Sequence, residues 1–136
     1  GPLREEVDRL AADLVPGRFM RSTFRHEQMP HLYRSADLFL HTKIRESFGN
    51  VYVEALSCGT PIVAHAAQGA RWILGEHATL VDTELQAALT EAIVNAVTTR
   101  RPDAASADWA HQRFSWEVVA GKYLDFFGQV VRSTTP

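Results

Sequence analysis

The feature that most constrains the fold is an apolar segment, a loop, a helical pattern and a second apolar segment in immediate succession. Residues 37–41 and 61–64 have the composition of short buried strands. Between them, apolar residues recur at helical spacing from Asn50 onward. Gly59 suits the left-handed position after a last helical turn, and Pro61 cannot continue a helix but can open a strand. The sequence therefore predicts a strand–loop–helix–turn–strand unit, which places ligands at strand ends.

The loop before this helix is a candidate anion site. The first N–H groups of a helix have no partner inside it, and here they cluster around Phe48, Gly49 and Asn50. Glycine lets the backbone come close to a ligand. The helix dipole adds only about 0.3–1 kcal/mol, so the placement of the amides matters more. We predict that the loop binds phosphate.

Two carboxylates flank the loop, Glu46 before the helix and Glu54 one turn into it. Glu54 is placed to accept two hydrogen bonds from neighbouring hydroxyls, as on a ribose, each worth roughly 1.5–3 kcal/mol. Glu46 is expected to face whatever lies beyond the phosphate. For each of them, the alternative is a solvated acid with no ligand.

The stretch from Glu46 to Ala64 resembles the donor-binding motif of retaining GT-B glycosyltransferases, the large "group 1" family. Glu46, seven residues that include Phe48-Gly49, and Glu54 are followed by Ala-Leu-Ser-Cys-Gly-Thr-Pro-Ile-Val-Ala. Residues 32–40 resemble the family's helix-then-strand lead-in and residues 114–117 its closing helix, so the likeness covers nearly the whole chain. It implies transfer of a sugar from a nucleotide-diphosphate sugar to an acceptor with retained configuration, without a metal or other cofactor.

The resemblance also implies roles for single residues. The backbone amides of Phe48, Gly49 and Asn50 would meet the donor phosphates. Glu54 would hold the ribose, and Glu46 would lie against the transferred sugar as the candidate catalytic residue.

Other polar residues near the motif have two interpretations each. Lys43 and Arg45 could approach a donor phosphate, or form a solvated pair. His41 and His65, at predicted strand ends, could touch the donor or form polar edges of the pocket wall. Cys58, the only cysteine, excludes an internal disulfide and is interpreted as a small buried residue near the helix end. The histidines lack the spacing of metal ligands, so no metal site is predicted.

The chain departs from the family pattern in two places. Residues 68–72 read Gln-Gly-Ala-Arg-Trp where the family usually has Gly-Gly-x-Pro-Glu, which places contacts from that loop in doubt. The family's C-terminal half opens with a strand, an Arg and a Lys that clamp the diphosphate, and a second strand, and this chain begins after them. Residues 1–136 are thus expected to be a partial C-terminal donor domain lacking its first two strands, with residues 114–136 as the closing helix.

The remaining pattern alternates helix and strand, which predicts an α/β fold with a Rossmann-like parallel sheet and flanking helices. Thr83 and Gln86 suit a capping box before one helix, and Ser115 suits the cap of the last. The other expected elements are a helix at 3–14, a weak strand at 18–24, a helix at 27–34, a helical turn at 70–74, a strand at 79–81 and helices at 85–97 and 103–112. In the doubly wound order, the strand at 18–24 would lack its two neighbours, so we expect association of copies or rearrangement.

Length and charge narrow the functional classes. The 136 residues suffice for one domain, and a net charge of −2 gives no reason to expect nucleic acid. Without a long apolar run or a signal-peptide pattern, the cytoplasm is expected, with peripheral membrane contact left open.

The sequence favours the donor-binding part of a sugar transferase whose acceptor site and missing N-terminal GT-B domain lie outside this chain. Alone, it is expected to be inactive or weakly active. The alternative is a non-catalytic remnant or fragment that acts as a nucleotide-binding or interaction module. A sugar epimerase on the same two-domain plan is a third hypothesis, which the Glu46 to Glu54 spacing does not favour.

Overall fold

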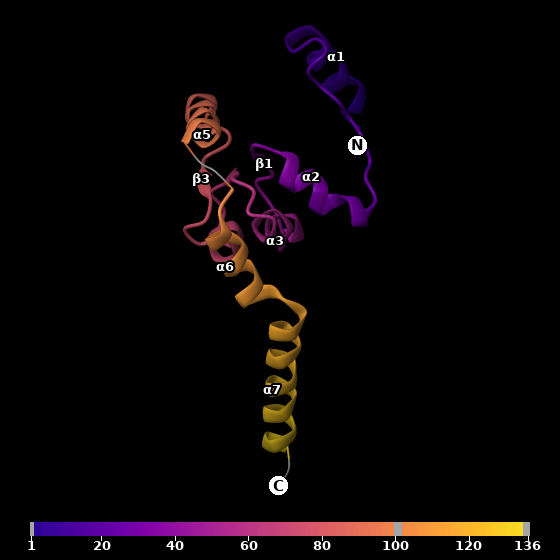
Figure 1. Ribbon diagram of the computed structural model, residues 1–136. Coiled ribbons are helices and arrows are strands. Elements are labelled where there is room, and N and C mark those ends of the chain that lie inside the picture. The colour runs from indigo at the N-terminus through magenta and orange to yellow at the C-terminus, as the bar shows by residue number, and fades with distance from the viewer. Residues whose placement is uncertain (1, 100–101, 135–136) are drawn as a thin grey trace.

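A computed structural model describes residues 2–99 and 102–134 (Figure 1). The elements are α1 (Arg4–Leu14), η1 (His26–Gln28), α2 (Met29–Ser35), β1 (Phe39–His41), α3 (Asn50–Ser57), β2 (Ile62–His65), α4 (Gln68–Leu74), β3 (Thr79–Val81), α5 (Gln86–Thr99), α6 (Ala104–Phe114) and α7 (Trp116–Thr134). Except for the strand at 18–24, each predicted element is present, and α7 matches the predicted closing helix. Positions 135 and 136 of that prediction lie outside the described residues.

Within the described residues, three parallel strands form the sheet, in the order β1-β2-β3. Alternate residues of β2 face opposite sides: Ile62 and Ala64 pack in the cluster that contains α3, α4 and α6, whereas Val63 packs against α5. Figure 1 shows α5 on one side of the strands and α3 and α6 on the other. The predicted Rossmann-like α/β architecture is confirmed, with β2 buried between two helical layers as parallel strands require.

The motif helix α3 begins and ends where the sequence places its boundaries. Gly49 precedes it with φ 76°, and Gly59 follows it with φ 68°, both left-handed. A Cβ on Gly59 would lie 3.0 Å from the carbonyl oxygen of Asp103, so glycine here also permits close approach of the chain before α6. Tyr52, Ala55 and Leu56 are the buried face of α3. This packing fixes the helix that carries Glu54.

The strand predicted at residues 18–24 is wrong. The segment is exposed, and it pairs with none of the described strands. Arg21 instead ties it back to α1, with its guanidinium 2.7 Å from Asp8 Oδ1. A strand needs a neighbour to satisfy its backbone, and β1 is not beside this segment, so the β-forming pattern has no ladder to join.

The capping box predicted for Thr83 and Gln86 is also wrong. The helix α5 begins at Gln86, and the Thr83 hydroxyl lies 2.9 Å from His65 Nδ1 and 3.3 Å from the carbonyl oxygen of Thr42. Thr83 therefore joins the ends of β1 and β2 and does not cap a helix. The other predicted cap is confirmed: the Ser115 hydroxyl accepts a hydrogen bond from the Val118 N–H at 3.4 Å.

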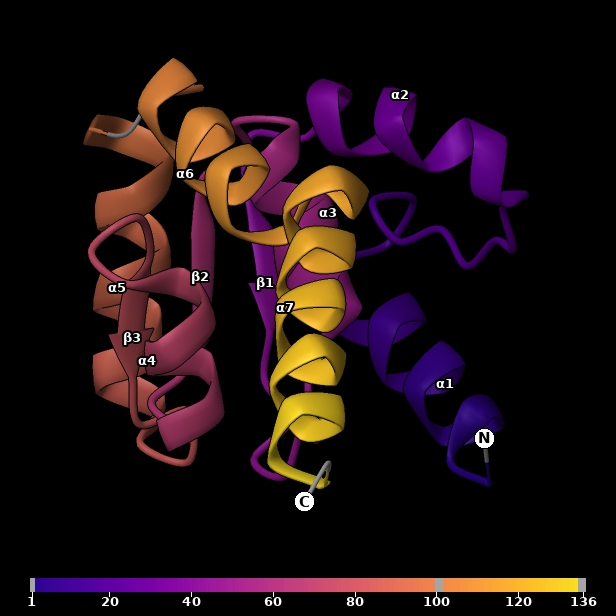
Figure 2. The same cartoon turned by 90° about the horizontal axis from the view of Figure 1, so that it is seen from below.

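Two terminal helices leave apolar faces uncovered. The apolar side chains of α1 are exposed apart from the buried Ala11. The helix α7 extends away from the sheet (Figures 1 and 2), and aromatic and aliphatic side chains along it are exposed. The exposed large apolar residues are Val7, Leu10 and Leu14 of α1 and Leu3, which directly precedes the helix. Across residues 2–99 and 102–134, no helix is both long and apolar enough to cross a membrane.

Candidate functional site

The loop from Glu46 to Asn50 joins β1 to α3 in a conformation that only glycine allows. A Cβ on Gly49 would lie 2.6 Å from a ring carbon of Tyr52 and 3.0 Å from Glu46 Cγ. Within the described part of the chain, no hydrogen bond engages the N–H groups of Phe48, Gly49 or Asn50. The three amides predicted to meet phosphate therefore stand at a helix start with their donor capacity available.

Glu54 is held by a buried tyrosine. The Tyr33 hydroxyl donates to Glu54 Oε2 at 2.9 Å, and the Tyr33 side chain is 4% exposed. The Tyr33 ring packs edge-on against Phe39 of β1 at 5.5 Å, which fixes it between α2 and the sheet. Burial, and then the bond to Glu54, raises the pKa of the Tyr33 phenol well above its usual range. The phenol therefore stays protonated at neutral pH and can donate to the carboxylate.

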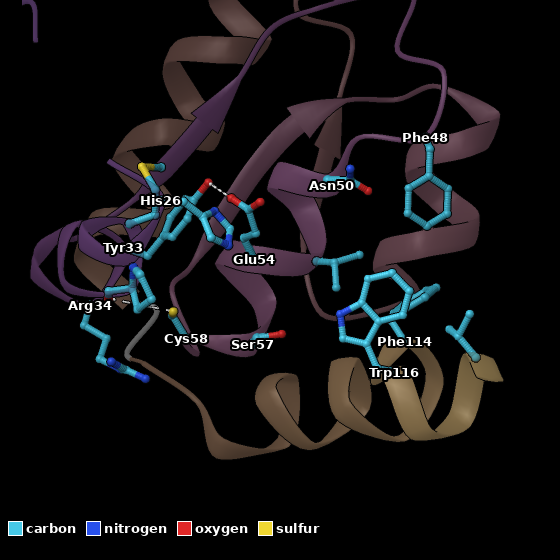
Figure 3. A pocket seen from close by; sticks show the side chains of 14 residues that line it. His26, Tyr33, Arg34, Phe48, Asn50, Glu54, Ser57, Cys58, Phe114 and Trp116 are labelled. Carbon is cyan, nitrogen blue, oxygen red and sulfur yellow. Dashed lines mark hydrogen bonds between the residues drawn. The ribbon is translucent and has the colours of Figure 1, made fainter. Parts of the chain in front are cut away.

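A pocket of about 510 Å³ opens beside this pair, between α2, α3 and the start of α7 (Figure 3). Three predicted donor-binding residues line it: Phe48, Asn50 and Glu54. Figure 3 shows the Glu54 carboxylate and the Tyr33 hydroxyl joined on one wall, with Phe114 and Trp116 on the wall formed where α6 meets α7. The exposed surface of the rest of the wall is largely apolar, and its further polar residues are His26, Arg34, Ser57 and Cys58.

Glu46, the predicted catalytic residue, does not line this pocket and has its own set of partners. Its Oε2 lies 3.0 Å from Lys43 Nζ and 3.6 Å from His41 Nε2, and its Oε1 accepts the Ser47 N–H at 3.1 Å. The hydrogen bond from the Lys43 ammonium is the main cause that holds the pKa of Glu46 below its usual value. Glu46 is thus kept ionised.

Of the two predicted cations, Lys43 binds Glu46 rather than standing free for a phosphate. Arg45 is exposed, and it forms no ion pair with any other residue that the structure describes. The predicted contact of Arg45 with a donor stays a prediction.

His41 connects Glu46 to the core. Its Nδ1 lies 3.0 Å from the Tyr52 hydroxyl, and the two rings meet edge to face at 4.9 Å. Tyr52 is 1% exposed, and burial, followed by the nearby charge of Glu46, raises the pKa of its phenol. His65, by contrast, bonds Thr83.

Tyr33 and Tyr52 were not among the predicted site residues. The available signal was that each lies on a predicted helix, Tyr33 ahead of the motif and Tyr52 within it, and that a buried phenol must find a hydrogen-bond partner. Which partner it finds depends on contacts between α2, α3 and β1 that periodicity does not encode.

Phe48 is tied to two other helices through aromatic rings. Its ring lies 6.3 Å from Trp72 of α4 and 6.1 Å from Phe114 of α6, and these two lie 5.7 Å apart. Arg113 stacks over Trp109 at 4.4 Å and over Trp72 at 5.3 Å. The Gln-Gly-Ala-Arg-Trp segment that departs from the family pattern thus supplies a ring that anchors the motif loop.

The remaining singled-out residues do not form a metal site. In the described ranges, no three or more His, Cys, Asp or Glu side chains gather so as to hold an ion. Cys58 is half-buried at the end of α3 and lines the pocket, with its thiol pKa raised chiefly by burial. Trp116, which also lines the pocket, is 84% exposed.

Comparison with known proteins shows which family shares this arrangement. The family described as "Glycosyl transferases group 1" matches residues 1–111. The chain is 40% identical over 107 residues to a phosphatidyl-myo-inositol mannosyltransferase of Mycobacterium leprae, covering 74% of this chain and 28% of that protein. It is 34% identical over 110 residues to a D-inositol 3-phosphate glycosyltransferase of Salinispora tropica, covering 77% and 23% respectively.

A solved structure has the same fold. Sucrose-phosphate synthase from Thermosynechococcus elongatus superposes with a TM-score of 0.81 and 25% identity, covering 98% of this chain and 36% of that one. The chain therefore spans well under half the length of these relatives. Its motif, its parallel sheet and the match over residues 1–111 show that the chain belongs to the group 1 glycosyltransferase family.

Proposed function

We propose that this chain is the donor-binding part of a retaining glycosyltransferase and holds a nucleotide-diphosphate sugar at the start of α3. The observation that carries the proposal is the placement of Glu54, bonded to Tyr33 at 2.9 Å, beside a pocket that Asn50 and Phe48 also line. One Glu54 oxygen is engaged by Tyr33, and a carboxylate has acceptor sites left for ribose hydroxyls.

The donor would extend from this pocket across the motif loop. Its diphosphate would meet the amides of Phe48, Gly49 and Asn50, and its sugar would lie toward Glu46. In the reaction, the bond between the anomeric carbon and the diphosphate oxygen breaks and a bond to an acceptor hydroxyl oxygen forms, with the acceptor proton passing to the diphosphate. Donors aimed at the leaving diphosphate would supply the main stabilisation. Retention of configuration is part of the proposal.

We place the acceptor site on a partner domain, the N-terminal half of a GT-B enzyme, and treat residues 1–136 as part of the C-terminal domain. Alone, the chain would bind donor and turn it over weakly or not at all. The cytoplasmic location expected from the sequence stays a prediction, and the acceptor, base and sugar are left to experiment.

A second candidate is a nucleotide-binding module without catalysis. The observation that favours it is the Lys43–Glu46 ion pair at 3.0 Å, because it engages the carboxylate that the transfer would use. A turnover assay on the enzyme that contains this domain, with Glu46→Gln as the variant, separates the two. Loss of turnover in Glu46→Gln supports the transferase, and nucleotide binding without turnover in the wild type supports the module.

Calorimetry with UDP, GDP and ADP tests donor binding. We expect one of them to bind, and Glu54→Gln to weaken it by about tenfold, the loss of one charge-assisted bond. Glu91→Gln, on α5 at the opposite side of the sheet, is the matched control and should bind as the wild type does. If none of the three nucleotides binds at millimolar concentration, the proposal is wrong for this chain.

Association of copies is a further proposal. The exposed stripe of α1 and the outer edge of β1, which pairs only with β2 among the described strands, are the surfaces that would meet. Sedimentation at micromolar concentration should show species heavier than 15.2 kDa, and a single compact monomer would contradict it.

A further inference from the structure

His41 lies between the buried Tyr52 hydroxyl and the Glu46 carboxylate. Four side chains form a continuous series from core to surface: Tyr52, His41, Glu46 and Lys43. Tyr52 lies on the buried face of α3, and His41 is the last residue of β1. The His41 ring lies 6.1 Å from Phe39 and 4.9 Å from Tyr52. The series therefore runs from the buried Tyr52 through two partly exposed side chains, His41 and Glu46, to the solvated Lys43.

The two groups that approach Glu46 Oε2 differ in freedom. The Lys43 side chain is 61% exposed on a flexible stem, whereas His41 is 17% exposed and packed against rings. An exposed ion pair of this kind is worth little and is exchanged readily with solvent or with another anion. The donor that stays in place when Lys43 moves is His41.

The Nε2 of His41 faces Glu46, and whether it carries the ring proton depends on Tyr52. A buried hydroxyl needs a partner, and the Tyr52 hydroxyl lies 3.0 Å from Nδ1. When the phenol donates to Nδ1, the neutral ring carries its proton on Nε2. That nitrogen lies 3.6 Å from Glu46 Oε2, slightly beyond a full hydrogen bond. A small movement of the carboxylate would close the gap.

We propose that Tyr52 and His41 are positioning residues: Tyr52 sets the tautomer of His41, and the Nε2–H of His41 holds Glu46 Oε2 so that Oε1 faces the Gly49 loop. Lys43 is the exchangeable counter-ion of the same carboxylate. The inference rests on the proposed function, since it assigns Glu46 to the sugar part of a nucleotide-diphosphate sugar. Glu54 and its pocket are not involved.

The first test measures the tautomer of His41 by nitrogen-15 NMR of the ring, at a pH where histidine is neutral. We expect the Nε2–H form in the wild type and a mixture of both forms in Tyr52→Phe. Tyr123→Phe, on α7, is the matched control and should leave His41 unchanged. An Nδ1–H form in the wild type, or no change in Tyr52→Phe, would overturn the inference.

The second test compares a nucleotide sugar with its nucleoside diphosphate: UDP-glucose with UDP, and GDP-mannose with GDP. We expect Tyr52→Phe to weaken the nucleotide sugar by about fivefold, the size of one hydrogen bond, with the diphosphate unaffected. His41→Gln keeps an amide donor near Glu46 and should retain most of the difference, whereas His41→Leu should lose it. Equal loss for both ligands in Tyr52→Phe would mean that Tyr52 only supports the fold.

The two proposals fail separately. If no nucleotide binds, the proposed function is wrong, while the NMR measurement still decides whether Tyr52 sets the His41 tautomer. If nucleotides bind and the His41 tautomer is unchanged in Tyr52→Phe, the proposed donor site is supported and the positioning role is wrong.

Discussion

Glu54 and Glu46 flank one loop, yet the structure holds them in different ways. Glu54 has a neutral partner, the Tyr33 hydroxyl, and adjoins a pocket with largely apolar walls. Glu46 has a cation, a backbone N–H and a histidine edge around it. A carboxylate with a neutral partner keeps its charge available to hydroxyl donors, whereas one paired with lysine is already compensated. If the proposed donor binds, this difference predicts that Glu54 accepts hydrogen bonds from neutral hydroxyls and that Glu46 exchanges its Lys43 contact for one with the ligand.

The largest effect on stability is expected from Gly49→Ala, in the loop between the two carboxylates. A left-handed φ and a Cβ 2.6 Å from Tyr52 should together cost about 3 kcal/mol of unfolding free energy. Urea denaturation measures it. Gly17→Ala is the matched control for backbone strain alone, since Gly17 has φ 71° and no atom near its Cβ position, and it should cost roughly 1–2 kcal/mol. Equal losses in the two variants would show that the Tyr52 contact has no effect.

The next largest effect is expected from Tyr33→Phe, which should change the contacts of Glu54 and leave those of Glu46 intact. Without the phenol, Glu54 loses the donor that orients it, and nucleoside diphosphate affinity should fall by about fivefold. Calorimetry measures the loss, and the His41 tautomer serves as the control for the other carboxylate. If Tyr33→Phe changed the His41 tautomer and not the nucleotide affinity, the surroundings of Glu54 and Glu46 would not be independent.

A smaller effect concerns pH. The folded-state pKa of Glu46 is lowered, mainly by Lys43, below the ordinary 4.5, so its contribution to stability is present above 4.5 and is lost as pH falls through the lowered pKa. Lys43→Met should bring the pKa of Glu46 back up and flatten that part of the stability curve. Denaturant unfolding between about pH 3 and 6 measures the curve, with Lys122→Met on α7 as the control. A curve as steep as the wild type's would contradict the role of Lys43.

A last prediction concerns the two buried phenols at high pH. Burial raises the folded-state pKa of both Tyr33 and Tyr52 above the ordinary 10.0, so their contribution to stability is present below 10.0 and is lost as pH rises toward the folded-state values. Ultraviolet titration should show these two tyrosines ionising only when the chain unfolds. Ionisation of Tyr33 before unfolding would contradict its burial.

The motif half of the fold could be predicted from sequence because its signals are local. Gly49, Gly59 and Pro61 mark the ends of α3 and the start of β2 by their own backbone preferences. The strand at 18–24 could not be predicted correctly, since strand formation depends on a neighbour and not on composition alone. Thr83 had a capping pattern, but its hydroxyl binds His65, a contact made only once β1, β2 and β3 are side by side.

The motif brought together some of the residues that line the pocket, and their contacts with a donor stay predictions. The motif placed Phe48, Asn50 and Glu54 together, and the structure has all three at one pocket. It did not indicate that Lys43 would bind Glu46, nor that Tyr33 and Tyr52 would each contact one side of the site. Those contacts join residues 11 and 21 positions apart, on separate elements, and arise from packing.

The ring contact between Phe48 and Phe114 joins the motif loop to the corner between α6 and α7. Phe114 is the last residue of α6, one position before the cap of α7, so the ring that touches the motif loop sits at the corner from which a 19-residue helix extends (Figure 2). A helix of that length reaches about 28 Å, and a tilt of about 10° at the corner would move its far end by about 5 Å. A tilt at this corner would therefore move the far end of α7 much more than it moves the motif loop.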